Sequence, residues 1–246
     1  MKRTVFVYLG AAAALFVLWG IISLLLELPI VPKPWQVVVC LQQIFFSSIA
    51  VHMLYSLGRI AMGLFLAVGI GYPLGIFMGY AAAADRIFAP FVYLLYPVPK
   101  IALLPILMLL AGVGETSKIL MIFLIIVFQV IIAVRDAVRS VPHETYFPLL
   151  SLGASSFAVF RHVLWPASLP KFLTAVRIAM ATAISVLFFT ETFGAQYGLG
   201  FFIMDAWLRV NYLEMYAGIV VLSLLGLFLF SFLDFVEAQA CRWQHK

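Results

Sequence analysis

The sequence predicts an all-α integral membrane protein with about six transmembrane helices. Hydrophobic residues make up 65% of the 246 residues and charged residues only 10%, against about 45–50% and 25% in soluble domains. The charges leave long uncharged runs, and a chain in lipid satisfies its backbone hydrogen bonds most simply as helices. The alternating pattern of a membrane β-barrel is absent. This composition excludes a secreted enzyme, a nucleic-acid-binding module and a disordered chain.

The uncharged or nearly uncharged runs define the expected spans in order along the chain. The first is expected to be a retained anchor, because it exceeds the roughly 7–15 apolar residues of a cleaved signal. The third is interrupted by Lys100. The expected spans are Thr4–Leu26, Ile60–Ala84 with a backward extension from Ser48, Ile87–Gly114, Ile119–Val134, about Ser168–Thr190, and Met215–Leu233.

Basic residues predict the orientation of these spans. Positive residues gather in the cytoplasmic loops of membrane proteins, and the net charge here is +5. If the N-terminus lies inside, one set of loops carries Lys2, Arg3, Arg86, Arg135, Arg139, Arg161, Arg242 and Lys246. The opposite loops carry few basic residues, and acidic residues balance them. Both termini are therefore expected in the cytoplasm.

Two long connections divide the chain. Residues 1–27 form the N-terminal span, residues 28–47 an extracytoplasmic segment, and residues 48–246 a core of about five spans. Within the extracytoplasmic segment, Pro34 suits the first turn of a short helix over Trp35–Phe46. The second long connection, residues 139–167, lies on the expected cytoplasmic side.

This cytoplasmic connection predicts a short amphipathic helix. Gly153 permits a sharp turn, and Ser155 or Ser156 can cap a helix. Apolar residues then recur at helical spacing, and Pro166 is expected to end the helix. Such a helix can lie in a groove of a partner protein or on the membrane surface, and the pattern alone does not decide between them. Its apolar residues are Phe157, Phe160, Val163 and Leu164.

Six motifs, in order, resemble the nitrate/sulfonate/taurine-type permeases of ATP-binding-cassette (ABC) importers. Gly153, Val163 and Pro166 fit the spacing of the family's EAA loop, in which a Gly is followed at fixed distance by an aliphatic residue and a Pro. The resemblance covers about residues 28–246. The remaining motifs are HMLYSLGR at 52–59, GYPLGIFMG at 71–79, PVPKIALLP at 97–105, GVGETSK at 112–118 and ETFGAQYGLG at 191–200.

One departure from the family affects the coupling loop. Phe147, Pro148 and Leu149 stand where the family has Glu-Ala-Ala, and Pro148 disfavours helix at the preceding residue. Glu144, three residues earlier, is expected to supply the missing acidic group that docks an ATPase. The resemblance thus implies ATPase coupling through Glu144, Gly153, Ala154, Ser155, Phe157, Phe160, Arg161, Val163 and Pro166.

A charge within the third expected span and another after the fifth are candidates for a translocation path or gate, together with Pro97, Pro99 and Gly194. Lys100 follows Pro97 and Pro99, which break the helix, and a cation at membrane depth usually faces protein or water. The alternative is a hinge charge that pairs with a backbone carbonyl. Glu191 stands beside the glycine-rich turn that begins at Gly194, and its alternative is a solvated loop carboxylate.

A stripe of small residues runs along the second expected span. Gly71, Gly75 and Gly79 recur every four residues, which lets another helix approach closely. That helix is expected to belong to the same chain. A dimer seam or a moving gate is the alternative.

The resemblance implies a type I ABC importer permease with a short cytoplasmic coupling helix, in a bacterial-type inner membrane. The implied partners are a second permease copy, two cytoplasmic ATPases and an extracytoplasmic binding protein, with no nucleic acid. The chain lacks the G-x-x-x-x-G-K-[ST] loop, so ATP and Mg²⁺ are expected on the ATPase, and no cofactor or metal on this subunit. The rival hypotheses are an ATP-independent transporter or channel and, less favoured, a membrane enzyme.

Overall fold

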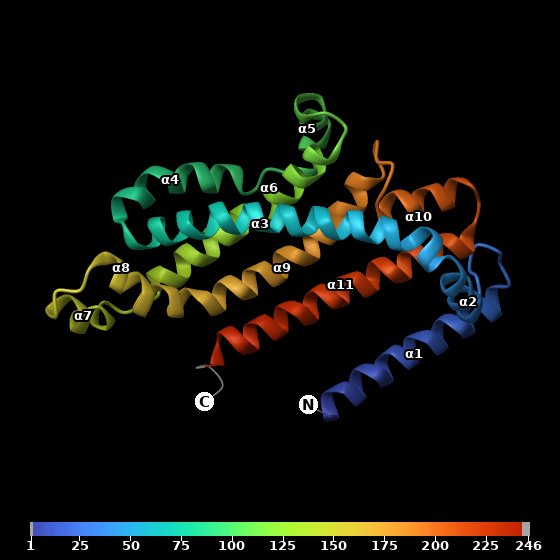
Figure 1. Cartoon of the computed structure of the whole chain (residues 1–246), viewed down its shortest axis with the longest axis horizontal. Helices are drawn as coiled ribbons and strands as arrows, with labels where there is room; N and C mark the ends of the chain where they lie inside the picture. Colours follow the sequence, from blue (N-terminus) through green and yellow to red (C-terminus); the bar gives the residue numbers. More distant parts are fainter. Residues whose placement is uncertain (1, 243–246) are drawn as a thin grey trace. The chain divides into compact units, whose positions relative to one another are not determined.

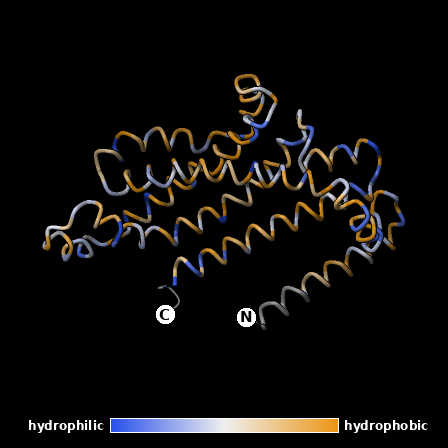
Figure 2. Tube along the Cα trace, viewed as in Figure 1, coloured by the Kyte–Doolittle hydropathy of each residue, from blue (hydrophilic) through white to orange (hydrophobic). Residues whose placement is uncertain are grey.

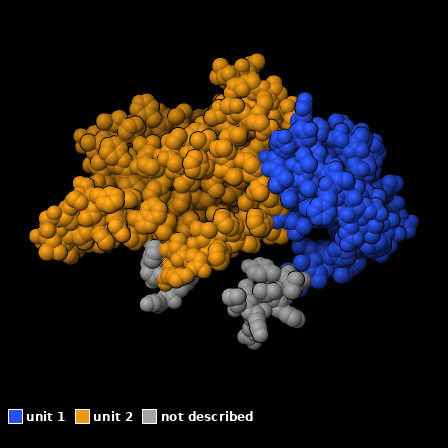
Figure 3. Space-filling model, viewed as in Figure 1, with its two compact units in different colours: residues 1–56, 196–224 blue, residues 57–195, 225–246 orange. Residues whose placement is uncertain are grey.

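The computed structural model describes residues 2–242, which consist of helices and their connections (Figure 1). The chain divides into two compact units (Figure 3). Unit 1 comprises residues 1–56 and 196–224, and unit 2 comprises residues 57–195 and 225–246. Helices α3 (Ala50–Tyr80) and α11 (Tyr212–Ala240) contribute residues to both units.

Membrane-length helices dominate the described part of the chain. Four helical stretches are long and apolar enough to cross a membrane, namely 34–80, 115–139, 156–191 and 212–240, and a bent helix pair over 82–111 makes a fifth if it counts as one span. The first expected span corresponds to α1 (Lys2–Leu26), within which Gly10–Leu26 forms a shorter apolar helix. Hydrophobic residues colour most of each long helix in Figure 2. The predicted all-α membrane fold is confirmed.

Unit 1 joins the N-terminal helix to short elements around it. Helix α1 is followed by α2 (Pro34–Ile44), and the hydroxyl of Ser23 donates to the Val31 carbonyl at 2.8 Å across the turn between them. The ring of Trp19 stacks on Tyr216 of α11 with 5.4 Å between centroids. Pro34 occupies the first turn of α2, as expected.

The helix expected over Trp35–Phe46 does not end before the second span, so that boundary was wrong. Helix α2 passes into α3 through a π-helical turn, η1 (Phe45–Ile49), which makes one continuous stretch over Pro34–Tyr80. The amide of Ala50 donates to the Phe45 carbonyl, five residues back, instead of breaking the hydrogen-bond ladder. Neither glycine nor proline stands in this turn, so nothing in the local sequence stops the helix.

Unit 1 also contains a helix that the sequence analysis did not predict. The glycine-rich turn ends at Gly198, whose φ is 127°, and α10 (Leu199–Leu208) follows directly. Its buried residues include Phe202 and Ile203, which lie against Gly218 of α11. A short apolar run between glycines and charged residues carries too little periodicity to predict a helix.

Unit 2 is organised around three long helices that lie side by side in Figure 1. They are the later part of α3, α6 (Glu115–Arg139) and α9 (Trp165–Glu191). Successive contacts from Gly71 with Val130 to Gly79 with Val138 show that α3 and α6 run in the same direction. The core includes Met121, Ile126, Ala179 and Leu187, all nearly inaccessible to solvent.

Two helices joined by a sharp bend connect α3 to α6. Helix α4 (Ala82–Leu95) and the stretch formed by η2 (Lys100–Leu103) and α5 (Leu104–Ala111) meet at 82°. Pro97 and Pro99 stand in the break, as the sequence predicts. The second span was expected to continue to Ala84, but α3 ends at Tyr80, because Ala81 is extended (φ −104°, ψ 110°) and caps α4. A run of alanines carries no sequence signal for such a stop.

The fifth span begins earlier than expected, and Pro166 does not end a separate helix. The connection from α6 contains η3 (His143–Thr145) and α7 (Phe147–Ser151), and then α8 (Ser156–Val159), the π-turn η4 (Phe160–Leu164) and α9 form one helical stretch. Pro166 lies in the first turn of α9. The π-turn explains why the proline is tolerated: the Trp165 amide bonds to the Phe160 carbonyl, so the ladder is already offset where the proline lacks its N–H.

Candidate functional site

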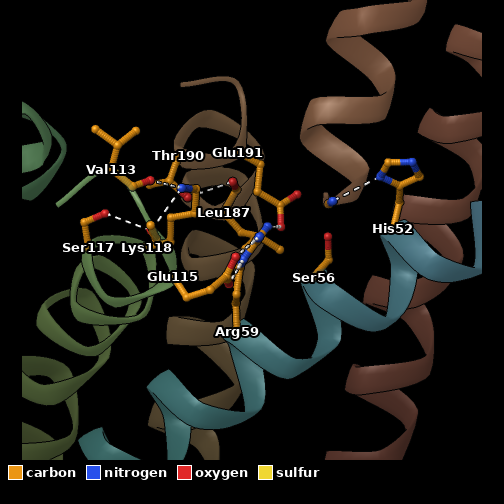
Figure 4. Close-up of polar contacts among 12 residues, drawn as sticks. His52, Ser56, Arg59, Val113, Glu115, Ser117, Lys118, Leu187, Thr190 and Glu191 are labelled. Carbon is orange, nitrogen blue, oxygen red and sulfur yellow. Dashed lines mark hydrogen bonds and ion pairs between the residues drawn. The ribbon is translucent and has the colours of Figure 1, made fainter. Parts of the chain in front are cut away.

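A buried cluster of charges joins the three long helices of unit 2 at one end (Figure 4). The guanidinium of Arg59 on α3 makes a bidentate ion pair with Glu115 of α6. Its Nε and Nη2 each donate to a carboxylate oxygen at 2.6 Å. Its Nη1 lies 2.6 Å from Oε1 of Glu191, the last residue of α9. The side chains of Arg59 and Glu191 are 1% and 0% exposed, whereas Glu115 is half exposed. A buried charge needs such compensation, so this cluster fixes the three helices together.

The side chain of Glu191 lies inside the protein. The side chain is fully buried and ion-paired, so the alternative of a solvated loop carboxylate was wrong. The adjacent Gly194 has a φ of 58°, and a side chain there would overlap Val113. The turn after α9 therefore packs tightly against the turn before α6. A gating role for Glu191 and Gly194 stays a prediction.

Lys118 reinforces the same end of unit 2. Its Nζ donates to the carbonyls of Val113 at 2.7 Å and Gly114 at 3.1 Å (Figure 4). The residue is almost completely buried. It therefore fixes the backbone turn that precedes α6, in which Gly112 has a φ of 80°.

A second charged cluster lies at the other end of α6. The carboxylate of Asp85, in the first turn of α4, pairs with Arg135 and with Arg139, at 3.1 Å from the latter. Arg135 also donates to the hydroxyl of Tyr93 at 2.9 Å. Asp85 and Arg135 are both buried. Two of the arginines that the sequence assigns to a basic loop thus hold the start of α4 against the end of α6.

The expected coupling residues lie in the segment 140–164, between α6 and α9. Glu144 is exposed in η3, and Gly153 turns the chain with a φ of 70°. The hydroxyl of Ser155 caps α8 by accepting from the Ala158 amide at 3.3 Å, as predicted. The other expected coupling residues are Ala154, partly buried; Phe157 and Arg161, exposed; Phe160 and Pro166, partly buried; and Val163, buried.

This segment has one apolar side packed inward and another exposed. Val159 and Leu164 form a cluster with Val138 of α6. Phe147 is 56% exposed, Leu152 87% and Phe157 70%. Large apolar side chains with such exposure are typical of a surface that meets a partner or lipid.

Lys100 lies at the bend between α4 and α5. Its Nζ donates to the carbonyl of Leu95 at 3.0 Å and to that of Tyr96. The rings of Tyr96 and Phe128 lie 5.3 and 5.0 Å from the ammonium. The side chain therefore satisfies carbonyls that the helix break frees, as the hinge alternative describes, and it also lines a cavity. A role in the path stays a prediction.

The glycine stripe of α3 faces α6 of the same chain. A Cβ at Gly75 would lie 2.8 Å from Cβ of Val134. A Cβ at Gly71 would lie 3.1 Å from Val130, and a Cβ at Gly79 would lie 2.6 Å from Val138. Contacts under 3.0 Å do not occur between real side chains without a shift. The stripe thus brings two helices of unit 2 into close contact.

Sequence reasoning did not identify Arg59 or Asp85 as site residues. Arg59 was seen only as the last residue of a motif, although a charge at the edge of an uncharged span is a signal that a partner exists. The partner could not be named, since Glu191 lies 132 residues away along the chain.

Membrane-length helices that buried ion pairs hold together define a multi-pass membrane protein. The chain belongs to the family of binding-protein-dependent transport system inner membrane components, whose family model matches residues 71–240. It is a multi-pass inner-membrane permease subunit of an ABC importer, as the motifs predicted.

Curated relatives match over almost the whole chain. The taurine transport system permease protein TauC of Escherichia coli (strain K12) is 35% identical over 93% of this chain and 86% of its own. The putative aliphatic sulfonates transport permease protein SsuC of Bacillus subtilis (strain 168) is 28% identical over 95% and 86%. The formylaminopyrimidine transport permease protein ThiX of Halalkalibacterium halodurans is 28% identical over 94% and 93%.

A solved structure shares the fold. A chain of the inward-facing MetNI methionine ABC transporter aligns with a TM-score of 0.62 and 21% identity, covering 78% of this chain and 93% of that one. The expected type I importer permease fold is thereby confirmed.

Proposed function

We propose that this permease is driven by separate ATPase subunits that dock on the segment 140–164, and that it carries a small organic sulfonate. The observation that carries the first part is the exposed apolar surface formed by Phe147, Leu152 and Phe157. It lies where the chain leaves α6 and enters α9, which are central helices of unit 2. Force applied to this segment therefore acts on the core directly.

The continuous helix from Ser156 to Glu191 supplies the lever. Its 36 residues span about 54 Å at 1.5 Å per residue. One end carries the docking residue Phe157, and the other carries Glu191 in the cluster with Arg59. A displacement of the docking end thus reaches the charged cluster without passing through a flexible joint. The ATPases can switch the permease only if they bind its two states with different affinity.

The proposed assembly has two copies of this chain, two ATPases that bind ATP and Mg²⁺, and one extracytoplasmic binding protein. The family description, a binding-protein-dependent transport component, supports the last of these. Both termini and the segment 140–164 face the cytoplasm in this proposal, as the distribution of basic residues indicates.

The substrate class rests on the relatives. The taurine permease is 35% identical and the sulfonate permease 28%, and both names describe carriers of small sulfonates. The formylaminopyrimidine permease, at 28% identity, names the competing class. Sulfonates are the better-supported substrate because two relatives share that chemistry.

Co-purification with the ATPase encoded beside this chain tests the docking surface. Leu152→Asp and Phe157→Asp are expected to lower ATPase retention by about tenfold or more, because a charge left unpaired in an interface costs roughly 2–5 kcal/mol. Glu144→Ala tests the expected substitute for the family's acidic residue. Val210→Asp, at a similarly exposed apolar position, is the matched control and should retain the ATPase.

Equal retention by all variants would overturn the docking surface. If the wild-type chain retains no ATPase, the ATP-driven mechanism fails and an ATP-independent transporter takes its place. The substrate class is tested separately by uptake of radiolabelled taurine in cells that express the whole importer. Uptake of formylaminopyrimidine without uptake of taurine by the same cells would assign the chain to the other class.

A further inference from the structure

A cavity of about 440 Å³ opens in unit 2 beside the bend between α4 and α5. Its polar lining comes from Tyr96 and Lys100 at the bend, Gln129 of α6 and Thr182 of α9. The remaining lining is apolar and includes Ile101 and Ile125. Sites for small molecules are usually about 300–1,000 Å³, mostly apolar, with a few placed polar groups. The cavity has this composition and this size.

The charge of Lys100, which lines this cavity, differs from that of the paired arginines of unit 2. Arg59, Arg135 and Arg177 each form ion pairs with carboxylates. Over residues 2–242, no carboxylate pairs with Lys100, and its hydrogen-bond partners are the carbonyls of Leu95 and Tyr96. An ammonium has three N–H donors, so one remains for a ligand. Carbonyls also leave the full positive charge in place, which is costly at membrane depth.

Two further polar groups in the cavity are available to a ligand. Within the described chain, the side chains of Gln129 and Thr182 have no hydrogen bond to protein groups, and both line the cavity. Gln129 is partly buried in the middle of α6. An amide N–H, a hydroxyl and an ammonium that converge on one space are donors suited to an oxyanion.

We propose that the Lys100 cavity is an anion site on the translocation path, with Lys100 as counter-ion and Gln129 and Thr182 as hydrogen-bond donors to the sulfonate group of the substrate. The inference rests on the proposed function for the identity of the ligand. The cavity, its lysine without a carboxylate partner among residues 2–242 and its hydrogen-bond donors do not depend on it. Along α6 the site lies between the two clusters of ion pairs, and part of its lining comes from α6 and α9, which the segment 140–164 connects.

Charged thiol reagents test the site without requiring transport. Thr182→Cys is prepared in a chain whose Cys40 and Cys241 are replaced by Ala, and is assembled into the full importer. Its modification rate is measured with sulfonatoethyl methanethiosulfonate, an anion, and with its trimethylammonium counterpart. Thr174→Cys is the matched control: it is an exposed threonine on the same helix, about 12 Å away along the axis.

Adding Lys100→Met is expected to lower the ratio of anionic to cationic modification rates at position 182 by about fivefold or more, because an unpaired charge in a cleft concentrates ions of opposite sign. Lys100→Arg should preserve the ratio, and position 174 should not respond, because Thr174 is not part of the cavity lining and exposed charges are screened within about 8–10 Å. Isethionate should slow the anionic reagent at position 182.

In the uptake assay, Lys100→Met and Gln129→Leu should lower taurine transport, while Arg86→Met, at an exposed position on α4, should not.

The outcomes separate the two proposals. An unchanged ratio, or no reaction of either reagent at position 182, overturns the anion site even if taurine uptake is normal. A changed ratio with no uptake of taurine by the wild-type importer supports the site and overturns the proposed substrate class. If anionic lipid slows the reagent and isethionate does not, the cavity holds a lipid headgroup and the assignment to the path is wrong.

Discussion

Arg59 is the residue on which the charged end of unit 2 depends. It bonds two carboxylates from two other helices, and one of them, Glu191, has no access to water. Removing the arginine leaves that carboxylate buried without its ion-pair partner, whereas the half-exposed Glu115 can turn to solvent. The buried Glu191, and not the half-exposed Glu115, is therefore expected to determine how much stability the loss of Arg59 costs.

Arg59→Met is expected to destabilise the permease by about 3–5 kcal/mol, as breaking a buried pair does. Thermal unfolding of the purified chain in detergent, followed by tryptophan fluorescence, measures the loss. Adding Glu191→Gln should restore much of the stability, because the buried charge is then gone. Arg209→Met is the control, since the pairs of Arg209 with Asp205 and Glu214 are partly exposed and such pairs contribute about 0–1 kcal/mol. Equal effects at the two arginines would contradict this interpretation.

Residue-scale prediction from sequence succeeded where a local signal existed. Either Ser155 or Ser156 was expected to cap a helix, and Ser155 does, because capping depends on neighbours a few residues away. The charges at Arg59 and Asp85 had no local signal for their partners. Their pairs connect residues 132 and 50 positions apart, and only the packing of the helices brings them together.

At the scale of elements, the contact between α3 and α6 depends on glycine at a few positions. Gly75→Ala is expected to destabilise the permease by about 1–3 kcal/mol, because the added methyl group meets Val134 and the Ile131 carbonyl. Gly58→Ala on the same helix has open space around it and should be neutral or stabilise by about 0.5–1 kcal/mol. Unfolding midpoints of the two variants give the comparison, and a destabilised Gly58→Ala with a stable Gly75→Ala would refute the packing argument.

The bend between α4 and α5 depends on the prolines in its break. With Pro97 and Pro99 both replaced by Ala, the connection can continue as helix, so the 82° bend should open. Spin labels at Ile87 and Leu109, both exposed, should move apart in a pulsed electron resonance measurement. Pro90→Ala, inside α4 and away from the break, should leave the distance unchanged. An unchanged distance in the double variant would show that packing alone holds the bend.

Long elements were predictable because a lipid environment demands uncharged runs of a given length. The runs located every long helix, and Pro97 and Pro99 located the bend between α4 and α5, but the other joints were not predicted. Helix α3 stops at Tyr80 inside a run of alanines, and Pro166 sits within a continuous helix because a π-turn precedes it. Both outcomes depend on the backbone at a single joint, the extended Ala81 or the π-turn before Pro166, which local propensity does not indicate.

At the scale of the whole molecule, the orientation of the permease in the membrane is the principal prediction. Leu152→Cys, in the segment after α6, should react with an impermeant thiol reagent only in inside-out vesicles. Leu110→Cys, on α5 before α6, should react only in right-side-out spheroplasts. Both positions are at least 80% exposed, so accessibility within the protein is matched. The reverse pattern would place both termini outside and move the docking segment away from the ATPases.

The repeat of glycines along α3 has a consequence for how α3 and α6 find their alignment. Because Gly71, Gly75 and Gly79 recur every four residues, sliding one helix past the other by four residues, about 6 Å, places a glycine opposite a valine again at most positions. Close packing alone therefore does not select a unique register. The ion pairs do select one, because the same slide would separate Arg59 from Glu115. The buried charges thus fix a register that the glycine contacts alone would allow at several positions.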